Sequence, residues 1–177
     1  MVIPLATRAM KSKILLIPFC LIALVSFSQT PGLKIGDKAP EIRLPNTTGD
    51  TIALSMLRGK IVLVDFWATW CAPCVEEQAE LVKLYTKYKT AHFKSGEGFE
   101  IYGVSLDNKK TAWLNQISKQ KIVWTQVSDL KYWSSPVAKT YNIQELPFNV
   151  LIDGEGTIIA TNLHGSELDK LLAQFTN

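Results

Sequence analysis

The sequence is poor in the side chains that bind transition metals. It has three cysteines and two histidines in 177 residues, and His92 and His164 stand apart from each other and from every cysteine. A structural zinc site needs four Cys or His ligands, usually in closely spaced pairs. The scarcity disfavours a zinc site. We expect no metal or other cofactor, and we interpret both histidines as surface residues in loops.

Long apolar runs are lacking as well. The apolar run near the N-terminus covers residues 14–27, fewer than the roughly 20 that a helix needs to cross a bilayer. It follows three basic residues and precedes Ser28, an order typical of a secretory signal. We expect cleavage after Ser28 and an exported, periplasmic or extracytoplasmic protein. A retained membrane anchor is the alternative, and Met10 is an alternative start.

An excess of charge of one sign is lacking once that signal is removed. The chain has 19 Lys and Arg against 16 Asp and Glu; three basic and no acidic residues lie in 1–28, which leaves 16 of each. A neutral chain gives no electrostatic reason to bind nucleic acid or a membrane surface. We expect no nucleic-acid partner, and a membrane contact only if the signal is retained. The remaining length suits one domain.

Removing residues 1–28 also removes Cys20, so Cys71 and Cys74 are the remaining cysteines. Disulfides persist outside the cytoplasm. Closing so short a loop contributes only about 2 kcal/mol by the chain-entropy relation. A purely structural bridge is therefore the weaker alternative, and a redox-active pair is the stronger one.

Two apolar, β-branched runs, residues 61–67 and 99–105, are typical of strands covered on both faces. Apolar residues recur at helical spacing after Cys74, which predicts a helix to about Lys89. Turn and capping residues delimit the other expected elements. These are a hairpin within 41–54, a loop over 90–98, a helix over 109–120, a strand within 122–127, a helix within 129–142, a hairpin of 148–152 with 157–161, and a helix over 166–175.

The Cys71-Ala72-Pro73-Cys74 motif stands where the first buried strand ends and a helix begins. A helix N-terminus stabilises a thiolate, the form that attacks disulfides. Two intervening residues leave the second sulfur near enough to resolve a mixed disulfide. Pro73 fits the first helical turn because its missing N–H would have no partner there. We expect Cys71 to be the exposed attacking thiolate and Cys74 the buried resolving thiol.

Asp65 is the single carboxylate in the apolar run 61–67. Burial of an unpaired carboxylate raises its pKa, so that it can hold a proton near neutral pH. The functional interpretation is a base that takes the proton of Cys74 as the mixed disulfide resolves. The alternative is an acid at a strand end that binds backbone donors or water.

With these features the chain resembles the thioredoxin superfamily, specifically the TlpA-like and ResA-like extracytoplasmic thiol-disulfide oxidoreductases. The resemblance covers residues 36–175 and is carried by segments 64–68, 70–74, 104–107, 146–147 and 153–156. It implies an α/β thioredoxin fold: a central mixed sheet flanked by helices, with an N-terminal β-hairpin and an inserted βα segment. The domain would span 36–177, after a short lead over 29–35.

The resemblance also implies roles for single residues. Pro147 would be cis and lie opposite the dithiol, and Glu77 would be an acidic residue near it; the alternatives are a plain turn proline and a solvated helix face. The catalytic set is then Cys71, Cys74, Asp65, Pro147 and Glu77, and the expected substrate contacts are Trp70, Ala72, Pro73 and Leu146. In this chain Ala79 replaces a proline that most relatives have.

The leading hypothesis is a dithiol reductant that receives electrons from a membrane thiol donor and reduces disulfides in exported proteins, with apocytochrome c as one candidate. The alternatives are a disulfide oxidase or isomerase, a peroxiredoxin-type peroxidase, and a non-enzymatic binding module. Trp113, Trp124 and Trp133 are interpreted as core or flank packing rather than a cofactor site.

Overall fold

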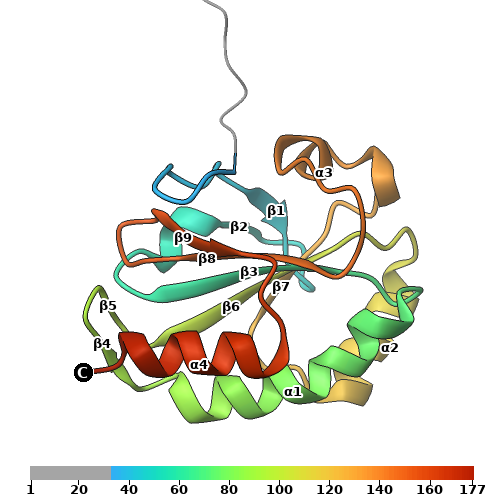
Figure 1. Cartoon of the computed structure of the whole chain (residues 1–177). Helices are drawn as coiled ribbons and strands as arrows, with labels where there is room; N and C mark the ends of the chain where they lie inside the picture. The colour runs from blue at the N-terminus through green and yellow to red at the C-terminus, as the bar shows by residue number, and fades with distance from the viewer. Residues whose placement is uncertain (1–32) are drawn as a thin grey trace, which may run out of the picture.

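The computed structural model of the chain describes residues 33–177 (Figure 1). The expected secretory signal over 1–28, its cleavage after Ser28 and the alternative start at Met10 lie outside the described residues. Within the described range, no helix combines the length and the apolar character needed to cross a membrane.

A five-stranded mixed sheet forms the centre of the molecule. Its strands, in spatial order, are β7 (Thr125–Val127), β6 (Phe99–Ser105), β3 (Ile61–Trp67), β8 (Phe148–Ile152) and β9 (Ile158–Thr161). β3, β6 and β7 are mutually parallel, whereas β8 is antiparallel to both β3 and β9. All seven residues of β3 are buried, as the unbroken apolar run predicts for a strand covered on both faces.

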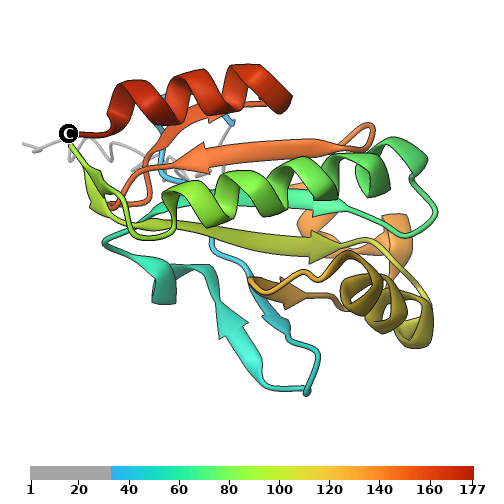
Figure 2. The same ribbon diagram turned by 90° about the horizontal axis from the view of Figure 1, so that it is seen from below.

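The two faces of the sheet are covered by different elements (Figures 1 and 2). Helices α1 (Ala72–Tyr88) and α4 (Gly165–Phe175) pack on one face, where the side chains of Leu63 and Trp67 point from the sheet into the same apolar cluster. The hairpin of β1 (Arg43–Pro45) and β2 (Thr51–Ala53), the 3-10 turn η1 (Leu54–Leu57) and α3 (Pro136–Thr140) cover the other. Because side chains alternate along a strand, Asp65 faces α1.

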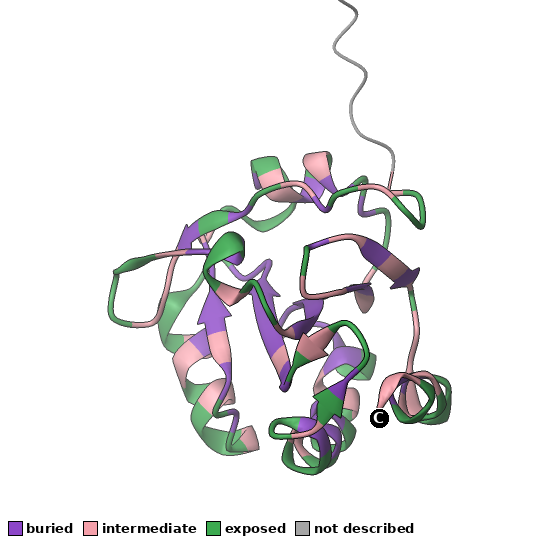
Figure 3. Cartoon of the chain, turned by 90° about the vertical axis from the view of Figure 1, so that its left-hand side faces the viewer, coloured by how far each residue is buried: buried purple, intermediate pink, exposed green. Residues whose placement is uncertain are grey.

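Buried residues concentrate in the strands and on the inner faces of the helices (Figure 3). Trp113, on α2 (Lys110–Gln120), and Trp124 are core residues, as predicted. Trp133 is not: its side chain is 37% exposed. The architecture is the predicted mixed α/β fold with its N-terminal hairpin.

Two segments differ from the sequence-based expectation. The expected loop over 90–98 contains a small hairpin, β4 (His92–Phe93) with β5 (Gly96–Glu97); two-residue strands are too short to show an alternating pattern. Within 129–142, a 3-10 turn, η2 (Tyr132–Ser134), precedes a helix of only five residues. Asn142, with a positive φ, follows that helix and is typical of a helix end.

Candidate active site

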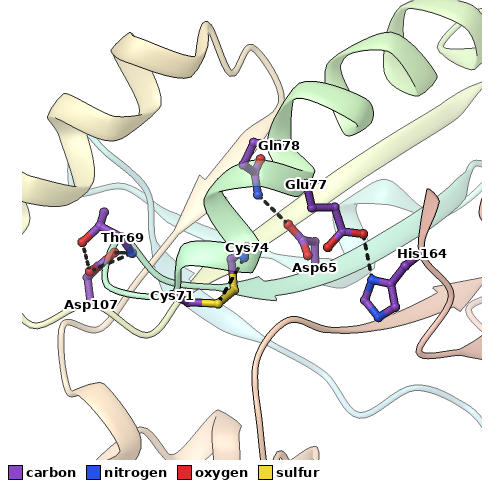
Figure 4. Close-up of a disulfide and its surroundings, with 8 residues drawn as sticks. All are labelled: Asp65, Thr69, Cys71, Cys74, Glu77, Gln78, Asp107 and His164. Carbon is purple, nitrogen blue, oxygen red and sulfur yellow. Dashed lines mark hydrogen bonds and ion pairs between the residues drawn. A yellow bond between two sulfur atoms is a disulfide. The ribbon is translucent and has the colours of Figure 1, made fainter.

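Cys71 and Cys74 are joined by a disulfide where β3 gives way to α1 (Figure 4). Cys71 is the N-cap of α1, and its Sγ accepts a hydrogen bond of 3.2 Å from the backbone N–H of Cys74. Ala72 and Pro73 form the first turn, as predicted. The first cysteine sulfur therefore occupies the position where a thiolate gains most from the helix N-terminus.

The two cysteines differ in accessibility, though less than expected. Cys71 is 6% exposed and Cys74 is 1% exposed. Cys71 is thus the more accessible of the two, but it is a buried residue rather than an exposed one, because in the disulfide form both side chains belong to the apolar cluster beneath α1.

Asp107 fixes the turn that leads into the disulfide. Its carboxylate accepts hydrogen bonds from the Thr69 backbone N–H, at 3.2 Å to each oxygen, and from the Thr69 hydroxyl at 2.6 Å. It also accepts one from the Ser105 hydroxyl at 2.7 Å. Sequence reasoning did not assign Asp107 to the site. The sequence did contain one signal for it: Asp107 follows a buried strand that is parallel to β3, and parallel strands end on the same side of a sheet.

Asp65 lies beneath the helix turn that follows Cys74. It is 1% exposed, and its Oδ2 accepts a hydrogen bond of 3.3 Å from Gln78 Nε2. Cys74 and Gln78 are four residues apart and both buried, so they share one face of α1. This arrangement brings the carboxyl group to the same buried side of the helix as Cys74.

The pKa of Asp65 is raised to about 7. Desolvation is the main cause and the negative charge of Glu77 the second, while the hydrogen bond from Gln78 acts in the opposite direction. The direction agrees with the expectation from the sequence. A carboxyl group with such a pKa changes charge around neutral pH and can exchange a proton there.

Glu77 does not lie on the solvated face of α1. Its side chain is 11% exposed, and its Oε1 lies 2.7 Å from Nδ1 of His164 (Figure 4). His164 Nε2 in turn lies 3.0 Å from Asn162 Oδ1. His92 is a surface residue, as expected, with 74% of its side chain exposed. His164 also lies in a loop, with 36% of its side chain exposed, but its pairing with a residue 87 positions away was not predicted, because such a contact gives no local sequence signal.

Asn149 on β8 holds the segment that carries His164. Its Nδ2 donates to the Leu163 carbonyl at 2.6 Å, and its Oδ1 accepts from the Leu163 N–H at 3.0 Å. Asn149 is buried and is the register partner of Asp65. The strand next to β3 thereby places His164 against α1.

The peptide bond between Leu146 and Pro147 is cis, as the resemblance implied. These two residues immediately precede β8. Because β8 is antiparallel to β3, they lie at the end of the sheet where β3 stops and Cys71 follows. A shallow pocket of about 360 Å³ lies between this end of the sheet and α1. Its lining residues are Pro73, Glu77, Glu80, Pro147, His164 and Gly165.

Trp70, directly before the first cysteine, is 43% exposed. Its ring centroid lies 4.9 Å from that of Tyr132 and 6.0 Å from that of Trp133. Trp133 is therefore not a core residue; it packs on the flank of the molecule against Trp70 and Tyr132, and its place beside the disulfide was not predicted. No spacing rule in the sequence connects Trp133 to a residue 63 positions earlier.

The site combines a disulfide at a helix N-terminus with a buried carboxyl group below it and a cis-proline at the same end of the sheet. This combination defines a thioredoxin-fold thiol-disulfide oxidoreductase. The chain belongs to the AhpC/TSA family, whose family model matches residues 35–161. It is 30% identical to the thiol-disulfide oxidoreductase ResA of Bacillus cereus, over 84% of this chain and 80% of that protein. The ResA of Bacillus subtilis is also 30% identical, over 85% and 79%.

Solved structures agree with the curated relatives. A thiol-disulfide oxidoreductase from Bacteroides fragilis is 36% identical with a TM-score of 0.71, covering 78% of this chain and 98% of its own. A putative thiol:disulfide interchange protein DsbE from Chlorobium tepidum is 30% identical with a TM-score of 0.68, covering 81% and 95%. The chain is a thioredoxin-like enzyme whose partners are proteins that contain disulfides.

Proposed function

We propose that this enzyme is a reductant, working outside the cytoplasm on disulfides of exported proteins. The observation that carries the thiol chemistry is the burial of Asp65, whose pKa is raised to about 7, on the same side of α1 as Cys74. The direction of electron flow follows the resemblance to the TlpA-like and ResA-like proteins, because a base speeds the closing and the opening of the disulfide alike. A base at that place assists the step in which Cys74 closes the internal disulfide and releases a reduced substrate.

The reaction begins from the dithiol form of the enzyme. The Cys71 thiolate attacks one sulfur of the substrate disulfide; a Cys71–substrate disulfide forms, the substrate S–S bond breaks, and the second substrate sulfur leaves as a thiolate. Asp65 then accepts the proton of Cys74, and the Cys74 thiolate attacks the Cys71 sulfur. The Cys71–substrate bond breaks and the substrate sulfur that Cys71 attacked also leaves as a thiolate; both substrate thiolates take up protons from water, so the substrate has gained two electrons. The enzyme is left as the Cys71–Cys74 disulfide, and Asp65 returns its proton to the solvent.

Each cycle therefore consumes two electrons, which have to be returned to the enzyme. Outside the cytoplasm no glutathione or thioredoxin pool keeps thiols reduced. The proposal accordingly includes a membrane thiol protein as the electron donor. Apocytochrome c is a candidate substrate, because haem attachment at a Cys-x-x-Cys-His motif uses both cysteines of that motif. The secretory signal over residues 1–28, cleaved after Ser28, is part of the same proposal.

The reduction potential of the Cys71–Cys74 pair tests the direction of electron flow. Equilibration of the purified enzyme with glutathione or dithiothreitol buffers, followed by thiol alkylation, measures it. A reductant is expected toward the thioredoxin end of the range from about −270 to −120 mV. A value near the oxidising end would instead support a disulfide oxidase or isomerase and overturn the proposal.

Insulin reduction tests the chemistry itself. The wild-type dithiol should reduce the insulin disulfides, and Cys71→Ser should abolish the reaction; activity retained in the variant would leave the binding-module alternative standing. Against the peroxidase alternative, the Thr69 hydroxyl is occupied as a donor to Asp107 at 2.6 Å. Consumption of hydrogen peroxide at a rate comparable to disulfide reduction would favour the peroxidase instead.

A further inference from the structure

Three large aromatic side chains stand at the surface next to the disulfide, and we call Trp70, Tyr132 and Trp133 the aromatic platform. They are 43%, 40% and 37% exposed. Their ring centroids are 4.9 to 6.2 Å apart, within the contact range of aromatic pairs. Exposed large apolar groups that touch one another are uncommon on soluble domains, and such a patch marks an interaction site.

The segment that carries Tyr132 and Trp133 is held in place by the fold. The Ser128 hydroxyl donates to the Ser105 carbonyl at 2.8 Å and accepts from the Leu130 N–H at 3.1 Å. Asp129 accepts hydrogen bonds from the Lys131 N–H at 3.2 Å and from the Ser135 hydroxyl at 2.9 Å. The bonds from Ser128 and Asp129 bracket the turn that enters η2.

The backbone of this turn is also unusual. Leu130 and Tyr132 have φ values of 56° and 55°, in the left-handed region that bulky side chains rarely adopt. Leu130 packs against the apolar cluster beneath α1. The turn therefore keeps a leucine inward and two aromatic rings outward, at a conformational cost that a loose surface loop would avoid.

The platform and the pocket beside Pro147 are separate surfaces that approach the disulfide from different elements. The platform comes from the turn before α1 and from the segment between β7 and α3, whereas the pocket is lined by α1, the residue before β8 and the start of α4. Figures 1 and 2 both place the segment between β7 and α3 at the end of the sheet where α1 begins. The pocket contains carboxylates and an imidazole; the platform presents aromatic rings.

We propose that the aromatic platform binds apolar or aromatic side chains next to the substrate cysteine that Cys71 attacks, so that the preferred substrates are cysteine segments with apolar flanks in unfolded or locally unfolded chains. This inference rests on the proposed reductant function. A substrate sulfur that reaches Cys71 brings its chain neighbours within reach of Trp70, the residue before Cys71. Burial of an apolar side chain on the rings removes apolar surface from water. Folded proteins hide such flanks, so unfolded segments present them best.

The test compares two disulfide peptides that differ only around their cysteines. One carries Leu and Phe at the flanking positions, and the other carries Ser and Gly. Single-turnover reduction by the wild-type dithiol should be about tenfold faster for the apolar peptide, a difference of about 1.4 kcal/mol. The double variant Tyr132→Ser/Trp133→Ser should bring this ratio to within about twofold. Tyr132→Phe/Trp133→Phe, which keeps the rings, should restore most of it.

Val123→Ser is the matched control. Among the residues that the structure describes, Val123 is the most exposed large apolar one, at 76%. It precedes β7, so it lies toward the end of the sheet away from the disulfide. This variant should keep the wild-type ratio. Equal rates for the two peptides in the wild type, or an unchanged ratio in the double serine variant, would overturn the platform as a docking surface. Reduction of 2-hydroxyethyl disulfide, which has no apolar flank, reports the dithiol alone; failure of the wild type there would overturn the proposed function.

Discussion

Asp65 on β3 lies directly opposite Asn149 on β8 in the antiparallel register, and the two residues serve the same site from neighbouring strands. Asn149 holds the backbone of Leu163 through both of its amide atoms. The next residue, His164, lies 2.7 Å from Glu77, whose charge helps to raise the pKa of Asp65. The buried acid is thus surrounded by groups from β8, α1 and the segment before α4.

Replacement of Asp65 by Asn should change the pH dependence of disulfide reduction. In the proposed mechanism the ionised carboxylate accepts the proton of Cys74, and with a pKa of about 7 its ionised fraction grows through neutral pH. The wild-type rate constant for insulin reduction should therefore rise through pH 7, and Asp65→Asn should lose this rise. Rates measured from pH 5 to 9 check it. Glu76→Gln, at an exposed position on the same helix, is the control and should keep the wild-type profile; identical profiles for all three proteins would count against the role.

The same carboxyl group should make the disulfide form less stable as pH rises. Its pKa is about 7 in the folded chain against the usual 3.8. Between these values the folded state keeps a proton that the unfolded state has released, so the free energy of unfolding falls with increasing pH, by up to about 4 kcal/mol. The stability of Asp65→Asn relative to the wild type should rise by an amount of that order between pH 4 and pH 8. Urea unfolding of both oxidised proteins measures it, and a pH-independent difference would contradict the expectation.

Glu77→Gln should lower the pKa of Asp65, because it removes the negative charge that is the second cause of the raised value. The rise of the reduction rate should move to lower pH, because a like charge that disfavours ionisation of Asp65 is then absent. Glu77→Gln introduced into Asp65→Asn should shift nothing further, since the titrating group is then gone. A shift of equal size in both backgrounds would show that Glu77 acts on another group.

The two cysteines should behave differently when a substrate is trapped. Cys74→Ser keeps the more accessible Cys71 but cannot resolve the mixed disulfide, so a covalent complex with a disulfide-bonded protein should accumulate. Cys71→Ser leaves a cysteine that is 1% exposed and should trap little. Non-reducing electrophoresis after reaction with insulin or an extracytoplasmic extract distinguishes the two variants. More complex with Cys71→Ser than with Cys74→Ser would reverse the assignment.

Much of the site was predictable because its signals are local. The apolar run over β3, the spacing of Cys71 and Cys74, and the single carboxylate of Asp65 each lie within a few residues of sequence. The turn at Pro147 was located by the resemblance, and its cis peptide bond agrees. These features are set by backbone periodicity and by the chemistry of adjacent residues, which a sequence displays directly.

The missed features depend on contacts between distant segments. His164 reaches Glu77 across 87 positions, and Asp107 reaches Thr69 across 38. Trp133 meets Trp70 only because the turn before α3 folds over the end of the sheet. In each case the residue type alone favours an ordinary role, a surface histidine, a turn aspartate or a packed tryptophan, and only the tertiary structure shows the contact that links the residue to the site.

Asp107→Ala should destabilise the protein and slow its reaction together. The change leaves the Thr69 N–H and the Thr69 and Ser105 hydroxyls without their acceptor, at a cost of about 2–4 kcal/mol in the free energy of unfolding. It also frees the turn that presents Trp70 and Cys71, so the rate of attack on a small disulfide should fall. Asp107→Asn keeps one acceptor oxygen and should lose about half as much stability.

Asp50→Asn, at an exposed turn of the β1–β2 hairpin, is the matched control for removal of one carboxylate charge. Urea unfolding and reduction of 2-hydroxyethyl disulfide measure both effects, and stability equal to that of the control would show that Asp107 does not hold the turn.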